Sequence, residues 1–298
     1  MVFILGCAGA TPQVRLEIQA VTPAQHTILN VPFIPQEDNQ CGPASLAMVL
    51  HYHDAPIVME ALISQVYTPS LEGSLQPALI SSCRRNGFVA HVIHGTENLL
   101  QEVSNGFPVI VLQNLGLSWC PLWHYAVVTG YDVEEDFVLL HSGLTPHKQV
   151  PFRVFNRTWS GSRHWGLVVL PPTKVPATAT ELSYIESVAG LEKAKEWQSA
   201  ITGYETALKR WPASLYARLA SGNCYHEMGD LESAADVLRE ATKLSPNSAI
   251  AFNNLAQVLF EQGKVTEALD AATRAVAIGG AMQSVYRETF EEIKSQLH

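Results

Sequence analysis

Among the residue types that can do chemistry, Cys41 has the sequence context of a nucleophile. Polar, turn-forming residues 36–40 (QEDNQ) precede it, and Gly42, Pro43 and an apolar helical pattern through Leu50 follow it. This order predicts a thiol in the first turn of a helix, where backbone N–H groups and the helix dipole favour the thiolate. The alternative is that Cys41 is a small apolar residue of the core.

A nucleophilic cysteine needs a base, and His124 has the strongest context of the eleven histidines. It opens residues 124–132 (HYAVVTGYD), whose β-branched and aromatic residues predict a strand that ends near a glycine turn. A histidine at the start of a core strand is held rigidly, which suits a general base. The alternative is a histidine that only fills the core.

The elements that would position these two residues are a helix and several strands. Residues 137–141 follow at hairpin distance, 107–112 form an apolar strand upstream, and 165–170 read as the last strand. A cysteine on a helix and a histidine far downstream on a strand are brought together only by folding, which is typical of cysteine peptidases. The pattern predicts an α+β domain.

Residues 27–172 resemble the double-glycine (bacteriocin-processing) cysteine peptidases. The resemblance is carried by Gln-x4-CGPASLAM from Gln36, GFPVI at 106–110, and HYAVVTGYD at 124–132. It implies a papain-like fold, with the N-terminal helix packed on an antiparallel sheet, and hydrolysis of peptide bonds after glycine. It also implies that Cys41 is the nucleophile and His124 the base. A glutamine before the cysteine would donate to the oxyanion, worth about 3 kcal/mol. Gln36 is one residue closer to Cys41 than the family pattern, so Gln40 is the alternative donor.

The third member of the family's site departs from the pattern. The family places an aspartate after the second strand to orient the histidine, and here Ser142 stands at that place. A hydroxyl can accept a hydrogen bond from imidazole but stabilises an imidazolium less than a carboxylate does. Two functions therefore stay open, a peptidase and a non-catalytic peptide-binding module. A related acyl transfer, such as amide hydrolysis or transamidation, is a weaker third reading.

The second half of the chain has a repeat of 34 residues from Glu181 to the end. Small and turn-forming residues recur at this interval: Ala200, Ala234 and Ala268; Ala207, Ala241 and Ala275; Pro212 and Pro246; Gly229 and Gly263. This resembles three tetratricopeptide repeats with a capping helix near 284–296. An all-α solenoid of this kind implies a groove for a protein or peptide partner, and the alternative is that the repeats only support the first domain or a dimer.

Residues 173–180, rich in Pro, Thr and Ala, predict a semi-rigid linker between domains 27–172 and 181–298. The net charge is −9, from 28 acidic and 19 basic residues, without a basic cluster, so nucleic acid is not expected as a partner. No apolar run reaches the roughly 18 residues of a membrane span. No cofactor is expected, and no metal, since Cys120 and His124 lack a second ligand pair.

Residues 1–26 are expected to be a tail. Within it Ile4-Leu5-Gly6-Cys7 resembles the lipobox of bacterial lipoproteins, in which the cysteine is lipidated. A basic region and a longer apolar stretch are missing, so we expect residues 1–26 to hold the remnant of a longer signal peptide. This predicts a lipid anchor at Cys7 and a place in the bacterial cell envelope or periplasm. The alternative is a cytoplasmic protein with an unmodified N-terminus.

Overall fold

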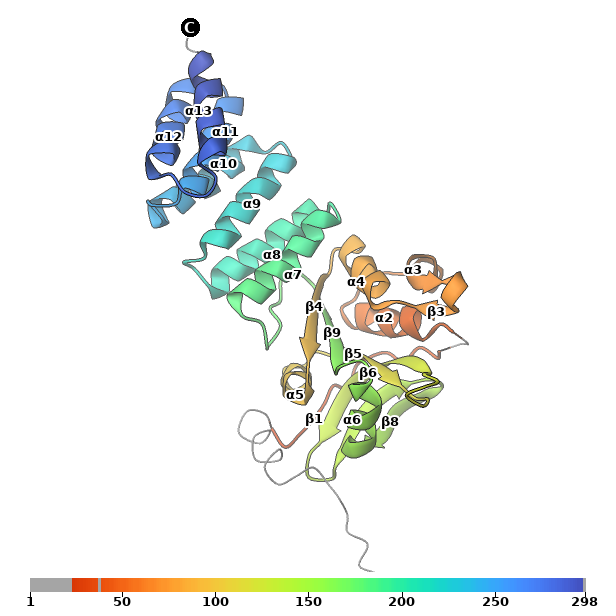
Figure 1. Cartoon of the computed structure of the whole chain (residues 1–298). Coiled ribbons are helices and arrows are strands. Elements are labelled where there is room, and N and C mark those ends of the chain that lie inside the picture. Colours follow the sequence, from red (N-terminus) through yellow and green to blue (C-terminus); the bar gives the residue numbers. More distant parts are fainter. Residues whose placement is uncertain (1–22, 37–38, 297–298) are drawn as a thin grey trace, which may run out of the picture. The chain divides into compact units, whose positions relative to one another are not determined.

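The computed structural model describes residues 23–36 and 39–296, which divide into two compact units (Figure 1). Unit 1 comprises the described residues up to Pro171 together with Pro176–Thr180, and unit 2 comprises Pro172–Val175 and the described residues from Glu181. Cys7 and most of the expected tail lie outside the described residues, so their predictions stand as made.

Unit 1 is built on an antiparallel sheet. Its strands follow the order β4 (Val89–His94), β9 (Trp165–Leu170), β5 (Val109–Asn114), β6 (Trp123–Asp132), β7 (Phe137–Ser142) and β8 (Thr145–Pro151). A short strand, β1 (Gln25–Thr27), pairs with the far end of β6. β1 therefore begins within the stretch expected to be a tail. Gly130 allows this pairing, because a Cβ there would lie 2.7 Å from the carbonyl oxygen of His26.

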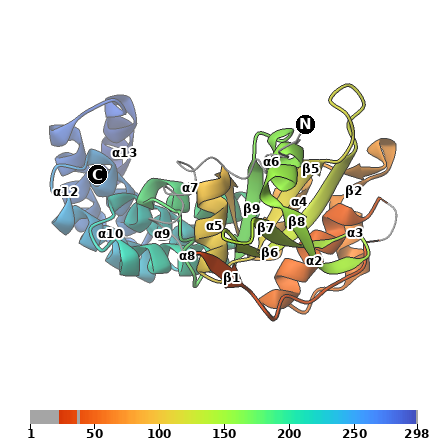
Figure 2. The same cartoon turned by 90° about the horizontal axis from the view of Figure 1, so that it is seen from below.

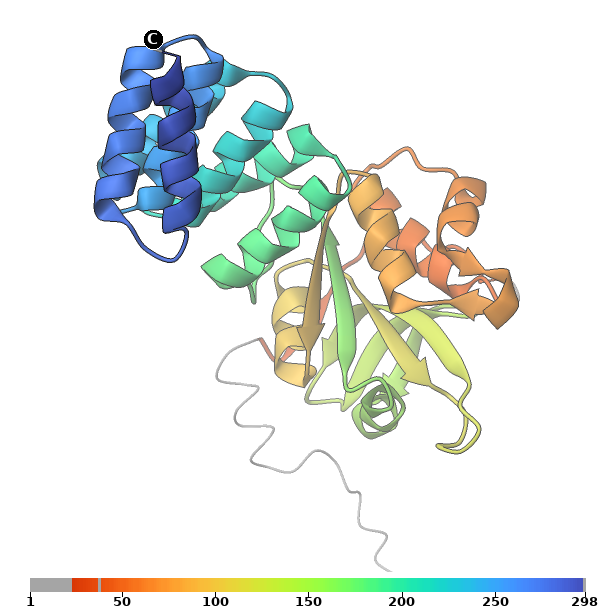
Figure 3. The same cartoon turned by 45° about the horizontal axis from the view of Figure 1, so that its top comes forward.

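Helices cover the sheet because its central strands are apolar on both faces. Residues Trp165–Leu170 of β9 are all buried, as are five consecutive residues of β5. The helix α2 (Cys41–Tyr52) packs against β6 and β5, α5 (Thr96–Ser104) against β4 and β6, and α6 (Phe152–Ser160) against β5 and β8. Figure 3 shows these helices around the sheet. The helix and strands predicted around Cys41 and His124 are thus present, in an α+β arrangement.

A helical corner completes unit 1 beside α2. It contains α3 (Met59–Val66), α4 (Gln76–Arg85) and a small hairpin of β2 (Tyr67–Thr68) and β3 (Gly73–Ser74), joined by the short 3-10 helix η1 (Pro69–Leu71). Nothing in the sequence patterns singled out this corner. It matters for the site because β3 lies against the start of α2.

Unit 2 is a run of antiparallel helix pairs, as the 34-residue repeat predicts. The pairs are α7 (Glu181–Lys193) with α8 (Trp197–Arg210), α9 (Leu215–Glu227) with α10 (Leu231–Leu244), and α11 (Ala249–Glu261) with α12 (Val265–Ile278), before the last helix α13 (Gln283–Ser295). The side chains of Ser214, Asp230 and Ser248 accept hydrogen bonds from the first turns of α9, α10 and α11, which explains where these helices begin.

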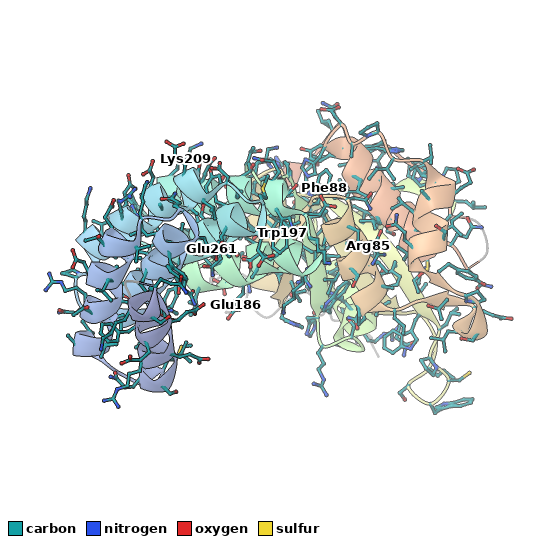
Figure 4. All side chains as sticks on the ribbon, turned by 90° about the horizontal axis from the view of Figure 1, so that it is seen from above. Arg85, Phe88, Glu186, Trp197, Lys209 and Glu261 are labelled. Atoms are coloured by element: carbon teal, nitrogen blue, oxygen red, sulfur yellow. The ribbon has the colours of Figure 1, made fainter. Side chains whose placement is uncertain are left out.

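Small residues let the helices of unit 2 cross closely. The alanines at 200, 234 and 268 and those at 207, 241 and 275 are all fully buried. A Cβ at Gly222 would lie 2.8 Å from Cγ of Leu238, so only glycine allows α9 and α10 to approach this closely. Exposed polar side chains such as Glu186, Lys209 and Glu261 point outward from α7, α8 and α11 (Figure 4). The residues that recur every 34 positions are thus those at which one helix packs on the next.

The expected linker is hydrogen-bonded along its length. The hydroxyl of Tyr184 donates to the carbonyl oxygens of Pro172 and Lys174, both within unit 2. Within unit 1, the buried carboxylate of Glu102 accepts from the backbone N–H groups of Ala177 and Thr178 at 3.0 and 2.8 Å. It also accepts from the Thr178 hydroxyl. Each half of the segment is therefore held by the unit to which it belongs.

No helix in the described part of the chain is both long and apolar enough to cross a membrane.

Candidate active site

Cys41 is the first residue of α2, so its sulfur lies among the unpaired backbone N–H groups of the first turn. The next position requires glycine, because a Cβ on Gly42 would lie 2.6 Å from both Cβ and Oγ of Ser74 in β3. Pro43 is tolerated because a first-turn N–H has no partner within the helix. The Cys-Gly-Pro sequence thus fits a cysteine at a helix start that is pressed against β3.

Burial controls the protonation of the half-buried Cys41 thiol. It raises the pKa of Cys41 above the usual value, and hydrogen bonds from the backbone amides of Tyr125, Gly42 and Cys41 only partly oppose this. The amides therefore favour the thiolate, as expected for a helix start, but desolvation outweighs them and favours the neutral thiol.

His124 lies beside Cys41 through the fold of β6. The backbone of Tyr125, the next residue, lowers the pKa of the Cys41 thiol, and Gln36 Nε2 contacts the carbonyl oxygens of both Cys41 and Tyr125, so the thiol lies near the peptide unit that joins His124 to Tyr125. The Nε2 atom of His124 forms a 2.9 Å hydrogen bond with the Ser142 hydroxyl, at the end of β7. No described residue is hydrogen-bonded to Nδ1, which leaves that ring nitrogen for another group.

The environment of His124 favours its neutral form. Burial lowers the pKa of His124 below its usual value, and the positive charge of Lys148 in β8 lowers it further. A neutral imidazole can accept a proton, so a lowered pKa preserves the base form into mildly acidic solution. Burial thus favours the neutral form of both Cys41 and His124.

Gln36 joins three elements at this site. Its Nε2 donates to the Ser45 hydroxyl at 3.0 Å and to the Tyr125 carbonyl at 3.1 Å, with the Cys41 carbonyl oxygen at 3.5 Å. Its Oε1 accepts from the backbone N–H of Gly143 at 2.7 Å. An amide has two N–H donors, and protein acceptors already engage both. Gln36 is therefore a brace between α2, β6 and the turn after β7, and it must release one N–H to serve an oxyanion.

Gln40, the alternative donor, is placed differently. It precedes Cys41 as the N-cap residue of α2, is half-buried, and makes no side-chain capping bond. Its side-chain amide has no hydrogen bond to any described residue. Of the two glutamines, Gln40 has the uncommitted donors.

The remaining chemistry-bearing residues have other surroundings. Cys83 and Cys224 are buried and Cys120 is exposed on the hairpin between β5 and β6. His141 is a structural residue, whose ring nitrogens meet the Val31 carbonyl and the His147 amide. Asp132 accepts from the backbone amides of Glu134 and Glu135, so it caps a turn and does not face His124.

Sequence patterns missed two contributors to the site. Ser45 is fully buried and receives the Gln36 donor; its spacing of four from Cys41 places both on one helix face and could have indicated it. Lys148 acts on His124 across the sheet. No local signal marks it, because it reaches the histidine only after β8 pairs with β7.

A cavity of about 510 Å³ adjoins the site. Ser74, which touches Gly42, and Tyr125, which follows His124, both line it, so it opens beside the cysteine. Leu75, Leu112, Trp123 and Trp165 supply apolar walls, and His94 and Arg163 contribute polar groups to the lining. Of the residues that line the cavity, none is acidic. A cleft of this size and polarity suits a few side chains of a peptide.

Comparison with known proteins separates the same two units. Residues 28–165 match the Peptidase C39 like family, and residues 222–271 match the TPR repeat. A solved putative C39-like peptidase from Bacillus anthracis is 20% identical and covers 51% of this chain and 98% of its own, with a TM-score of 0.43. The double glycine motif protease of an AMS/PCAT transporter, solved with a leader peptide, is 23% identical over 49% of this chain and 94% of its own, with a TM-score of 0.38.

For the helical unit, the Sgt2 TPR domain from Aspergillus fumigatus is 22% identical over 39% of this chain and 78% of its own, with a TM-score of 0.37. No curated protein matches the chain. The family matches agree with the antiparallel sheet of unit 1 and the helix pairs of unit 2. The chain therefore joins a peptidase C39-like domain, which contains Cys41 and His124, to a tetratricopeptide-repeat domain.

Proposed function

We propose that unit 1 is a cysteine peptidase of the double-glycine type, which hydrolyses peptide bonds after glycine. The observation that carries the proposal is the setting of His124. Its Nε2 is fixed by Ser142, and the thiol of Cys41 lies against the adjoining peptide unit, so Nδ1 is the nitrogen left to receive the thiol proton. The preference for glycine rests on the resemblance of the motifs around Cys41 and His124.

In this mechanism a neutral pair reacts only when substrate is present. The Cys41 proton moves to Nδ1 of His124 as sulfur bonds to the scissile carbonyl carbon, and the carbonyl electrons move to oxygen. Collapse of this intermediate breaks the C–N bond, and the proton passes from His124 to the leaving amine. Water, deprotonated by His124, then hydrolyses the thioester and releases the carboxylic acid and the thiol.

The oxyanion of this intermediate needs donors at the start of α2. The backbone N–H of Cys41 is one, and a glutamine side chain supplies the second. Gln40 has uncommitted donors, whereas Gln36 has to break a contact with Ser45 or Tyr125. We assign the brace to Gln36 and the second oxyanion donor to Gln40.

Substrate recognition is divided between the units in this proposal. The cavity beside Cys41 takes residues near the cut, and the repeats bind a further part of the substrate or a partner protein. A second cavity of about 300 Å³ supports the role of the repeats. Its apolar lining includes Phe252, Leu255 and Leu259 of α11, and the charged residues Arg239, Glu267, Asp270 and Arg274 surround them. This mixture fits a peptide segment with both apolar and charged side chains.

The test is cleavage of a synthetic peptide that carries a Gly-Gly pair, followed by mass spectrometry of the products. Wild-type protein and the Cys120→Ala control, which removes only an exposed thiol, should cut after the second glycine. Cys41→Ala and His124→Ala should not. Cleavage by Cys41→Ala, or no cleavage of any Gly-Gly peptide by the wild type, would refute the proposal.

The second candidate function is a peptide-binding module without turnover. Two observations favour it: Ser142 replaces the expected aspartate, and burial raises the pKa of the Cys41 thiol. The module binds a Gly-Gly peptide with the same affinity in wild type and Cys41→Ala, and calorimetry detects binding without product. Turnover that depends on Cys41 excludes it.

We further propose that Cys7 carries a lipid and holds the protein at the bacterial envelope, on the lipobox-like sequence alone. Mass spectrometry of the native protein tests this, because an unmodified Cys7 behind an intact Met1 excludes it.

A further inference from the structure

The hairpin that joins β5 to β6 is an exposed apolar projection. Its residues 115–123 (LGLSWCPLW) include no Asp, Glu, Lys or Arg. Five large apolar side chains are open to solvent: Leu115 at 49%, Leu117 at 58%, Trp119 at 80%, Leu122 at 62% and Trp123 at 47% exposure. Figure 2 shows this yellow hairpin standing out beyond the end of the sheet. In a protein of net charge −9, a run of this composition at a projecting tip is unusual.

The hairpin is an ordered structure rather than a loose loop. The Leu115 amide donates to the Leu122 carbonyl at 2.8 Å, and Leu117 and Cys120 exchange two bonds of 3.1 Å. Asn114 closes the base, because its Oδ1 accepts from the amides of Gly116 and Leu122 at 3.0 and 2.9 Å. A Cβ at Gly116 would lie 2.5 Å from the Cys120 carbonyl oxygen, so glycine permits the tight closure.

This closure pairs five of the eight backbone amides of residues 115–123 within the hairpin or with Asn114 at its base. Five amides are bonded internally, at positions 115, 116, 117, 120 and 122, and Pro121 has no N–H. Each amide paired in this way lowers the cost of entering a lipid bilayer, because hydrocarbon offers no hydrogen bonds. A protein interface surrounds its apolar centre with a polar rim, and charged groups fix the register of the partner, but residues 115–123 contain no charged side chain.

We propose that the tip of this hairpin inserts into the interfacial region of a lipid bilayer. Trp119, the most exposed of the five, prefers the headgroup level, and Leu117 and Leu122 enter the acyl boundary beside it. Because residues 115–123 carry no charge, the attraction is apolar and does not depend on anionic lipid. The inference is independent of peptidase activity and of a lipid on Cys7.

The test is sedimentation of the full chain with phosphatidylcholine vesicles, in a Cys7→Ser background that removes the lipidation site. Cys7→Ser protein should bind, with a blue shift of tryptophan emission, and high salt should not release it. Leu117→Ser with Trp119→Ser should weaken binding about tenfold or more, as expected when two large side chains lose burial. The matched control is Leu29→Ser with Leu244→Ser, at 78% and 55% exposure on other surfaces, and it should bind normally.

The substituted side chains are exposed, so the thermal midpoint of each variant should stay near that of its parent. Equal vesicle binding by parent and hairpin variant, or no binding by the parent, would overturn the proposal. A hairpin-dependent dimer without vesicle binding, seen by sedimentation velocity, would assign the tip to a second copy of the chain instead of lipid.

Discussion

Replacing Ser142 by aspartate restores the carboxylate that the double-glycine peptidases use to orient the histidine. In this protein Ser142 lies 2.9 Å from Nε2 of His124 and is 9% exposed, so the new group stays next to the ring. Ser142→Asp and Ser142→Ala together measure what the side chain that contacts His124 contributes to the proposed catalysis.

The hydrogen bond sets the size of the effect. A neutral bond of this kind is worth about 0.5–1.5 kcal/mol net, so Ser142→Ala should lower kcat/KM roughly 2- to 12-fold. A charge-assisted bond is roughly twice as strong, which by itself would raise kcat/KM by a similar factor in Ser142→Asp. Desolvation of a carboxylate at a nearly buried position offsets part of this gain, and we expect about a 2- to 3-fold increase.

The pH dependence of kcat/KM gives a second, independent test of the Ser142 contact. The reaction needs neutral His124, so kcat/KM rises with pH through the pKa of this group in the free enzyme. Burial and Lys148 lower that pKa in the wild type, whereas an adjacent carboxylate raises it. The acidic limb of the profile should therefore move to higher pH in Ser142→Asp. Ser142→Asn, a neutral acceptor of the same shape, should leave the limb in place.

The assay is cleavage of a fluorescence-quenched Gly-Gly peptide between pH 4 and pH 9. Each variant is first checked for a thermal midpoint close to the wild-type value. If Ser142→Asp and Ser142→Asn both leave the rate and the acidic limb unchanged, the Ser142 contact does not act on the base, and the reasoning about His124 is refuted.

Four further predictions concern side chains at the site and beside the linker. Lys148→Gln removes the charge that lowers the pKa of His124, so the acidic limb of kcat/KM should move to higher pH, whereas Lys174→Gln, an exposed control, should not move it. An unchanged limb in Lys148→Gln would contradict the assigned charge effect. Gln36→Ala leaves the buried Ser45 hydroxyl and the Gly143 amide without their partner, so the free energy of unfolding in urea should fall by about 2–4 kcal/mol. Gln40→Ala should change that free energy by less than about 0.5 kcal/mol but lower kcat if Gln40 serves the oxyanion; an unchanged kcat removes Gln40 from that role. Glu102→Ala releases Ala177 and Thr178, so limited proteolysis within residues 173–180 should become faster, and Glu97→Ala on the same helix should not have this effect. Equal proteolysis of both variants would show that Glu102 does not hold the segment.

Local patterns were enough to predict the elements around the proposed nucleophile and base. The apolar alternation from His124 and the Cys-Gly-Pro start of α2 are short-range signals, and both elements formed where these signals lie. The 34-residue period predicted the helix pairs for a similar reason, since each repeat packs on its neighbour through the same small residues.

Features that depend on long-range contacts could not be predicted from the sequence. The pKa of Cys41 follows burial against β3 and β6, which outweighs the helix start, and no residue near position 41 predicts that burial. Gln36 is hydrogen-bonded to residues as far as 107 positions away in the sequence. The local sequence could therefore not predict that its side-chain amide is already hydrogen-bonded. The linker was predicted from composition, whereas its bonds to Glu102 and Tyr184 come from tertiary structure.

The central claim is that His124 activates Cys41, and covalent labelling tests it most directly. The full chain is incubated with a Gly-Gly peptide that ends in a vinyl sulfone, and the modified residue is mapped by mass spectrometry. Exposed Cys120 serves as an ordinary thiol in the same molecule. Activation by His124 predicts rapid modification of Cys41, a large loss of that rate in His124→Ala, and slow, unchanged modification of Cys120. If Cys41 reacts no faster than Cys120, or equally fast without His124, the claim is contradicted.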